Sequence, residues 1–145
     1  MTLAVTEAEL RRLLRQVAFT RAYGFRLYAI GAGECTLDVP FQVDFERPGG
    51  IVGGQVFMAA ADVAMWLAIM TRLGAADGSV TAGMTSAFLG PARREPFRCT
   101  ARIVKLGSRL VYGVAESVAD GGRLLAHHSL TYARAPQGHP ARRDG

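Results

Sequence analysis

The sequence predicts one α+β domain in which an antiparallel sheet wraps around a single apolar helix, with a second helix near the N-terminus. Segment 55–71 is apolar on every side and contains one ionisable residue, Asp62, so we expect protein to surround it. Four β-rich segments follow and supply a sheet that can cover this helix. At 145 residues the chain is long enough for one such core and too short for two.

The N-terminal part predicts one helix and then two strands. Thr6 and Glu9 have capping-box spacing and precede leucines at helical intervals, so we expect an amphipathic helix that runs to about Thr20. Segments 22–30 and 34–41 are rich in β-forming residues, and the glycines between them indicate a turn. The segment 45–50 contains proline and paired glycine, which predicts an irregular loop before the central helix.

The C-terminal half predicts an antiparallel sheet of four strands, at 80–89, 97–106, 110–119 and 123–134. In the second of these, apolar residues alternate with Arg98, Thr100 and Arg102, which is typical of a sheet with one wet face. Asp120-Gly121-Gly122 predicts the turn of a hairpin. We expect residues 1–135 to form a single domain and residues 136–145 to be a disordered tail.

Composition and patterning exclude several classes of protein. Half of the residues are hydrophobic and 20% are charged, as in a packed globular protein. No secretory signal is apparent, and the apolar stretch 56–70 is shorter than a membrane span and contains a carboxylate, so we expect a cytoplasmic protein with no membrane partner. Cys35 and Cys99 lie in no metal-binding pattern and predict reduced core thiols, with no metal and no cofactor. The net charge is +5, but aromatics are not interleaved with the basic residues, so we expect no nucleic-acid partner.

Asp62 is the residue best suited to chemistry. Its neighbours one turn away on the helix are apolar, where an unpaired charge is costly. A structural aspartate paired with a nearby donor is about as common as a catalytic one. The start of the helix favours the catalytic role, because Gly53-Gly54-Gln55 present unpaired backbone N–H groups that can stabilise an oxyanion.

Four segments together resemble a known family. They are RPGGIVGGQVFMAAADVA at 47–64, SVTAGMTSAFLGPA at 79–92, VKLGSRL at 104–110 and LAHHSLTY at 125–132. They are similar to the hotdog-fold acyl-CoA thioesterases of the phenylacetate-pathway (PaaI-like) branch of the 4-hydroxybenzoyl-CoA thioesterase superfamily. This resemblance covers nearly the whole chain and implies the hotdog fold.

The resemblance also implies a reaction and an assembly. Asp62 would be the nucleophile or the general base, and Gly54 with Gln55 would supply the oxyanion site. The active site would lie at the subunit interface of a homodimer or homotetramer, with acyl-CoA as the substrate. The chain departs from the family pattern at Gly53, where many members have His, at Gln55, where Gly is frequent, and at Gly90, where Arg is common.

Further ligand contacts are predicted by residue type and position. We expect the acyl group near seven residues, although such residues are more often core or ordinary strand positions: Gly53, Met65, Trp66, Thr81, Met84, Thr85 and Phe88. Basic residues at strand ends and turns are candidates for the phosphates of coenzyme A, although each alone is typical of a solvated surface: Arg93, Arg94, Lys105 and Arg109.

Two other functions are compatible with the same fold. A hotdog hydratase needs a histidine to move the substrate proton, and segment 55–71 contains none. A domain that binds acyl-CoA or an aromatic ligand without hydrolysis is the leading alternative, because the usual histidine is missing at Gly53. The sequence leaves open the acyl group, the choice between dimer and tetramer, and the choice between nucleophile and general base.

Overall fold

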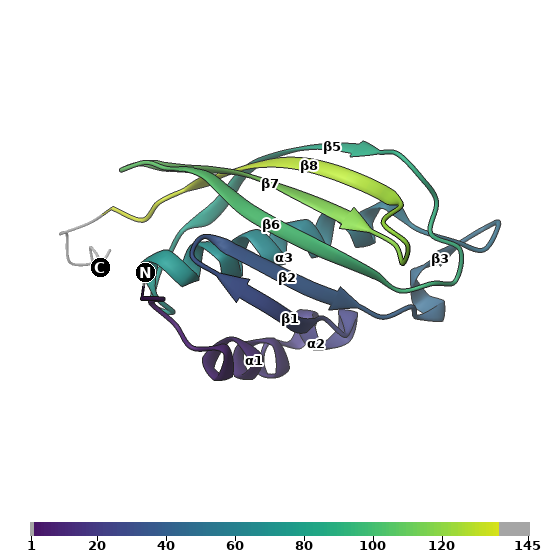
Figure 1. Cartoon of the computed structure of the whole chain (residues 1–145), viewed down its shortest axis with the longest axis horizontal. Helices are drawn as coiled ribbons and strands as arrows, with labels where there is room; N and C mark the ends of the chain where they lie inside the picture. Colours follow the sequence, from purple (N-terminus) through teal and green to yellow (C-terminus); the bar gives the residue numbers. More distant parts are fainter. Residues whose placement is uncertain (1, 137–145) are drawn as a thin grey trace, which may run out of the picture.

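The computed structural model describes residues 2–136 and has a curved six-stranded antiparallel sheet that wraps around one long helix (Figure 1). The sheet order is β1-β2-β6-β7-β8-β5. Its strands are β1 (Arg26–Gly31), β2 (Glu34–Val39), β5 (Val80–Phe88), β6 (Phe97–Leu106), β7 (Leu110–Val118) and β8 (Leu124–Ala133). The helices are α1 (Glu7–Gln16), α2 (Ala18–Tyr23) and the central α3 (Gly54–Leu73). The tail predicted at 136–145 lies, except for Pro136, outside the described residues.

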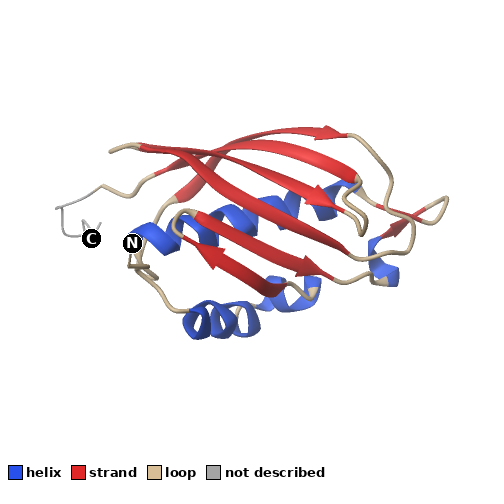
Figure 2. Ribbon diagram, viewed as in Figure 1, coloured by secondary structure: helices blue, strands red, loops and turns tan. Residues whose placement is uncertain are grey.

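Helix α3 is the centre of the core. Twelve of its residues are buried, and it packs against β1, β2, β5, β6, β7 and β8 (Figure 2). The helix has 20 residues, more than the apolar stretch 56–70, and by length and composition it passes as a membrane span. The length argument against a span was therefore wrong. Burial within the sheet accounts for its apolar composition, because a helix surrounded by protein needs apolar residues on every side.

The N-terminal region differs from the prediction. The chain is extended at Val17, which ends α1, and a second short helix follows, so residues 22–23 are helical and β1 begins at Arg26. The Thr20 hydroxyl donates to the Leu14 carbonyl oxygen over 2.7 Å and holds the break in place. Such side-chain bonds to the backbone compete with regular helix, and leucine spacing does not reveal them.

The loop predicted before α3 contains short regular elements. They are a 3-10 turn, η1 (Val43–Phe45), and a short hairpin. The strands of this hairpin, β3 (Glu46–Arg47) and β4 (Ile51–Val52), have two residues each. The Gly53 N–H donates to the Phe45 carbonyl oxygen over 2.9 Å, so this hairpin is tied to the start of α3. The loop is thereby held beside the helix N-terminus.

Strand β5 is an edge of the sheet and pairs with β8 alone. It is nine residues long, and Val80, Phe88 and the following Leu89 are each more than half exposed. Long apolar edges are a liability unless something covers them. The register with β8 sets Thr81 opposite Tyr132 and Ser86 opposite His128.

The two cysteines agree with the prediction of free core thiols. Cys35 on β2 and Cys99 on β6 are fully buried and form no disulfide. Burial raises the pKa of the Cys99 thiol to about 12, so it stays protonated and unreactive at neutral pH.

Candidate active site

The Asp62 carboxylate is held by two hydroxyl groups from the sheet. The Tyr132 hydroxyl lies 2.6 Å from Asp62 Oδ1 and 2.8 Å from the Asp62 carbonyl oxygen. The Thr81 hydroxyl donates to the same Oδ1 over 2.7 Å. These donors come from β8 and β5, which stand side by side over α3. The carboxylate therefore has the donors that a charge among apolar neighbours requires.

A cavity of about 500 Å³ opens beside this carboxylate. Its walls are mainly apolar, and it is lined by Phe19, Asp62, Val63, Trp66, Ser79, Val80, Thr81 and Tyr132. Asp62 is half-buried, so the carboxylate is still accessible. Three predicted residues, Asp62, Trp66 and Thr81, are thus brought together here.

Two lining residues that sequence reasoning missed are aromatic. Phe19 reaches the cavity because the N-terminal helix breaks and re-forms as α2, which no spacing rule anticipates. Tyr132 lies in a segment that resembles the family, but its role depends on the register of β5 against β8. The available signal was its alternation with buried Leu130 and His128, which assigns it to the inner face of β8.

Tyr132 is a neutral hydrogen-bond donor. Burial is the first cause that raises the pKa of its hydroxyl above the ordinary value, and the neighbouring Asp62 carboxylate is the second. Tyr132 is 3% exposed, so water has little access to the phenol ring. The hydroxyl therefore keeps its proton at neutral pH.

The start of α3 forms a second, separate site. Gly53 is the N-cap and makes no side-chain cap hydrogen bond. Among the described residues, the Gly54 and Gln55 N–H groups have no acceptor, as expected for the first residues of a helix. A methyl group added at Gly54 would lie 3.1 Å from Cε1 of Phe88, so glycine is needed for the close approach of that ring.

A cavity of about 520 Å³ adjoins this helix start. It is lined by Arg47, Ile51, Val52, Gly54, Phe57, Phe88, Leu89, Gly90 and Pro91. The predicted Gly54 and Phe88 are together here. Asp62 follows Gly54 by eight positions along the helix, which corresponds to about 12 Å between their backbones. One carbonyl group cannot contact both within a single chain.

Four of the residues predicted near the acyl group line neither cavity: Gly53, Met65, Met84 and Thr85. Met65 is 1% exposed and packs against Gly113 of β7, where the missing side chain makes room for it. Met84 packs against the core from β5. Thr85, the next residue along β5, is exposed on the opposite face of the strand from Met84. Gln55 is exposed, and its side chain folds back over Gly53.

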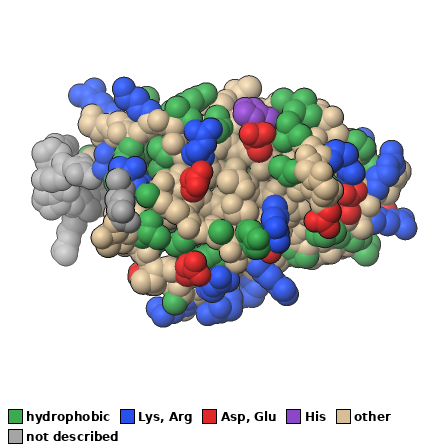
Figure 3. Space-filling view, in the orientation of Figure 1, with side chains coloured by type: hydrophobic (Ala, Val, Ile, Leu, Met, Phe, Trp, Pro, Cys, Tyr) green, Lys and Arg blue, Asp and Glu red, His purple; other side chains and the backbone are tan. Residues whose placement is uncertain are grey.

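The four predicted phosphate-binding residues fall into two groups. Arg93 and Arg94 precede β6, whereas Lys105 and Arg109 lie at its other end, and a ten-residue strand is about 30 Å long. Lys and Arg side chains cluster at both ends of the visible face and along α1 (Figure 3). A single phosphate site within one chain therefore cannot include all four residues.

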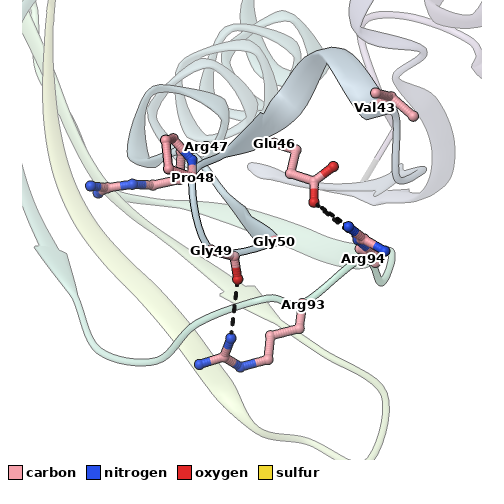
Figure 4. Close-up of a pocket in the computed structure, with 8 residues that line it drawn as sticks. All are labelled: Val43, Glu46, Arg47, Pro48, Gly49, Gly50, Arg93 and Arg94. Atoms are coloured by element: carbon pink, nitrogen blue, oxygen red, sulfur yellow. Dashed lines mark hydrogen bonds and ion pairs between the residues drawn. The ribbon is translucent and has the colours of Figure 1, made fainter.

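Arg93 and Arg94 line a cavity of about 800 Å³ with the loop between β3 and β4. Arg94 Nη2 lies 2.9 Å from Glu46 Oε1, and the Arg93 guanidinium donates to the Gly49 carbonyl oxygen over 3.4 Å (Figure 4). Arg47, which sequence reasoning did not select, points away from the Glu46–Arg94 pair and lines this cavity as well as the one at the helix start.

An antiparallel sheet wrapped around a helix that carries a carboxylate beside a cavity defines a hotdog-type domain. A family model described as the thioesterase superfamily matches residues 49–126, which is more than half of the chain. The matched segment includes both ends of α3 and all of β5. The protein therefore belongs to the thioesterase superfamily.

Individual relatives agree with this assignment. A protein of Saccharolobus solfataricus that carries an esterase name is 32% identical over 123 residues, covering 85% of this chain and 81% of that protein. The thioesterase HI1161 of Haemophilus influenzae has a TM-score of 0.85 at 20% identity, covering 96% of this chain and 100% of that one. The E. coli PaaI protein from the phenylacetic acid degradation operon has a TM-score of 0.80 at 16% identity, covering 90% and 94%. The predicted hotdog fold and thioester hydrolysis as the general activity are thus confirmed.

Proposed function

We propose that this protein hydrolyses acyl-CoA thioesters at a composite site, with Asp62 from one protomer and the start of α3 from the other. The separation of about 12 Å between Asp62 and Gly54 along α3 carries this proposal. A reacting carbonyl needs the carboxylate and the oxyanion donors each about 3 Å away. Neither the helix start nor the region around Asp62 meets both conditions within one chain, so a second copy has to complete the site.

The free edge of β5 supplies a way to bring two copies together. If β5 pairs antiparallel with β5 of the partner about a two-fold axis near Met84, then Val80 lies opposite Phe88 of the partner subunit. The Asp62 cavity includes the first residues of β5, and the helix-start cavity includes the last. This pairing joins the two kinds of cavity and covers the apolar edge.

The chemistry then follows from the groups at Asp62 and at the start of α3. The Asp62 carboxylate attacks the thioester carbonyl, or it removes a proton from the water that attacks. The N–H groups of Gly54 and Gln55 stabilise the oxyanion. The C–S bond breaks, the coenzyme A sulfur takes up a proton, and water provides the oxygen of the product acid. The two routes use the same carboxylate and differ in whether an acyl-enzyme anhydride forms.

Coenzyme A would extend from the helix start over the β3–β4 loop. Arg47 lines both the helix-start cavity and the larger basic cavity, so it marks a continuous path between them. Arg93 and Arg94 lie at the far side of that path. Guanidinium groups suit phosphate because they donate two hydrogen bonds in one plane. Lys105 and Arg109 lie too far away to serve the same phosphates.

The test is release of free thiol from aryl, short-chain and long-chain acyl-CoAs, comparing the native protein with Asp62→Asn. We expect the variant to lose roughly 10³-fold in kcat, because general acid–base groups contribute about 10²–10⁴-fold. Its circular dichroism spectrum should not change, since asparagine retains an acceptor for Tyr132 and Thr81. If neither protein releases thiol but acyl-CoA raises the Tm of both, the protein is a binding domain and the proposal fails.

A further inference from the structure

Both sheet hydroxyls meet the same oxygen of the Asp62 side chain. The Tyr132 and Thr81 hydroxyls lie 2.6 Å and 2.7 Å from Oδ1. Among the described residues, Oδ2 accepts no hydrogen bond. The carboxylate is thus anchored through one oxygen, and its other oxygen is left for a partner that the chain does not provide.

We infer that Tyr132 is a positioning residue that, with Thr81, holds Asp62 by Oδ1 and leaves Oδ2 as the oxygen that attacks the thioester or takes a proton from the attacking water. This inference rests on the proposed function, because it assigns a task to each oxygen of that same carboxylate.

Tyr132 is the stronger of the two anchors. Its hydroxyl also lies 2.8 Å from the Asp62 carbonyl oxygen, so it ties both the side chain and the backbone of this residue to β8. It is 3% exposed, whereas Thr81 is exposed on the edge strand. A buried donor faces little competition from water and keeps its geometry when substrate enters. Asp62 and Tyr132 are the two titratable side chains among the residues that line this cavity.

Donation to Oδ1 fixes the rotamer of the Asp62 side chain, so the carboxylate is already oriented when the substrate binds. This orientation changes the chemical step more than substrate affinity. A purely structural tie between α3 and β8 would change stability alone.

The test is Tyr132→Phe, which removes one oxygen atom from a buried ring. We expect kcat to fall roughly 10- to 100-fold with KM within about threefold, as for an interaction that acts on the transition state. Tyr112→Phe on β7 is the matched control, because Tyr112 is 43% exposed and lies outside the cavity.

Two further measurements make the outcome decisive. Thr81→Val removes the second donor to Oδ1 and should also lower kcat, while Thr81→Ser retains the hydroxyl and should restore most of kcat. In addition, ¹³C NMR of the aspartate carboxyl carbons, with the Asp62 signal assigned from its loss in Asp62→Asn, should show a changed chemical shift for this signal in Tyr132→Phe and an unchanged one in Tyr112→Phe. The NMR result does not depend on turnover, so it separates this inference from the proposed function. A folded Tyr132→Phe protein with a native chemical shift of that signal and native kcat would overturn it.

Discussion

The middle and the start of α3 differ in how much of a site one chain completes. At Asp62, in the middle of the helix, the donors are in place, with two hydroxyls within 2.7 Å of one oxygen and a mainly apolar cavity beside the carboxylate. At Gly54 the structure offers backbone N–H groups, a bare glycine surface under Phe88, and no carboxylate. The site at Asp62 holds the charge of its own carboxylate. The helix start can stabilise a negative charge that develops on the substrate.

The contrast explains why the edge strand matters. Thr81 at one end of β5 contacts the carboxylate, and Phe88 at the other end covers the helix start. A strand that carries half of a site at each end completes both sites when it pairs antiparallel with its own copy.

The largest effect on kcat is expected from inactivating the two halves of the composite site on different chains. Gly54→Pro removes the N–H of the first helical residue at a position where proline is tolerated, and we expect kcat to fall roughly 10²- to 10³-fold. Coexpression of Gly54→Pro and Asp62→Asn chains should restore about one quarter of native activity. Half of randomly formed dimers are mixed, and each mixed dimer has one intact site and one doubly defective site.

Gly54→Ala is the control for this experiment. It introduces the same steric conflict with Phe88, 3.1 Å from the added carbon, but it retains the N–H group. We expect its loss of kcat to be much smaller than that of the proline variant. If the coexpressed inactive chains form mixed dimers without recovering activity, the composite site is wrong and each chain has to work alone.

A smaller effect, on KM for acyl-CoA, is expected from the basic residues proposed to bind coenzyme A. Arg47→Ala and Arg93→Ala should each raise KM for acyl-CoA about three- to fivefold and leave kcat unchanged, since exposed ion pairs contribute up to about 1 kcal/mol. Lys105→Ala and Arg109→Ala, at the opposite end of β6, should leave KM within about twofold of native. Steady-state kinetics at low and high salt measures both sets, and equal effects from the two ends would contradict the path through Arg47.

Sequence reasoning located Asp62 because it is the one ionisable residue in an apolar helix, and it located the strands because their apolar residues alternate. It did not find Tyr132, whose contact with Asp62 depends on a strand register set by tertiary packing. It placed Met65 near the ligand because a helix that is apolar on every side does not reveal which face meets the sheet. The division of the basic residues between the two ends of β6, by contrast, followed from the predicted strand length and was overlooked.

The smallest effect concerns the hydrogen-bonded pair Ser86 and His128 on the inner face of β5 and β8. Ser86 Oγ and His128 Nδ1 are 2.7 Å apart, and His128 is fully buried with no partner for Nε2 among the described residues. Burial first, and then the charge of neighbouring His127, lowers the pKa of His128 to about 4. This pair should affect stability more than turnover.

The direction in which pH changes the stability follows from proton binding. An unfolded histidine titrates near 6.5, so between about pH 6.5 and 4 the unfolded chain binds a proton that the native His128 does not. Stability is therefore lost as the pH falls through this window, by about 2 kcal/mol between pH 7 and pH 5.

His128→Gln retains a polar partner for Ser86 without the titration, so its unfolding free energy in urea, measured at a fixed protein concentration, should lose about 2 kcal/mol less over the same interval. His127→Gln, on the opposite face of β8, should keep most of the native pH dependence. If His128→Gln instead follows the native curve, His128 takes up its proton at the same pH in the folded and the unfolded protein, and burial does not keep it neutral.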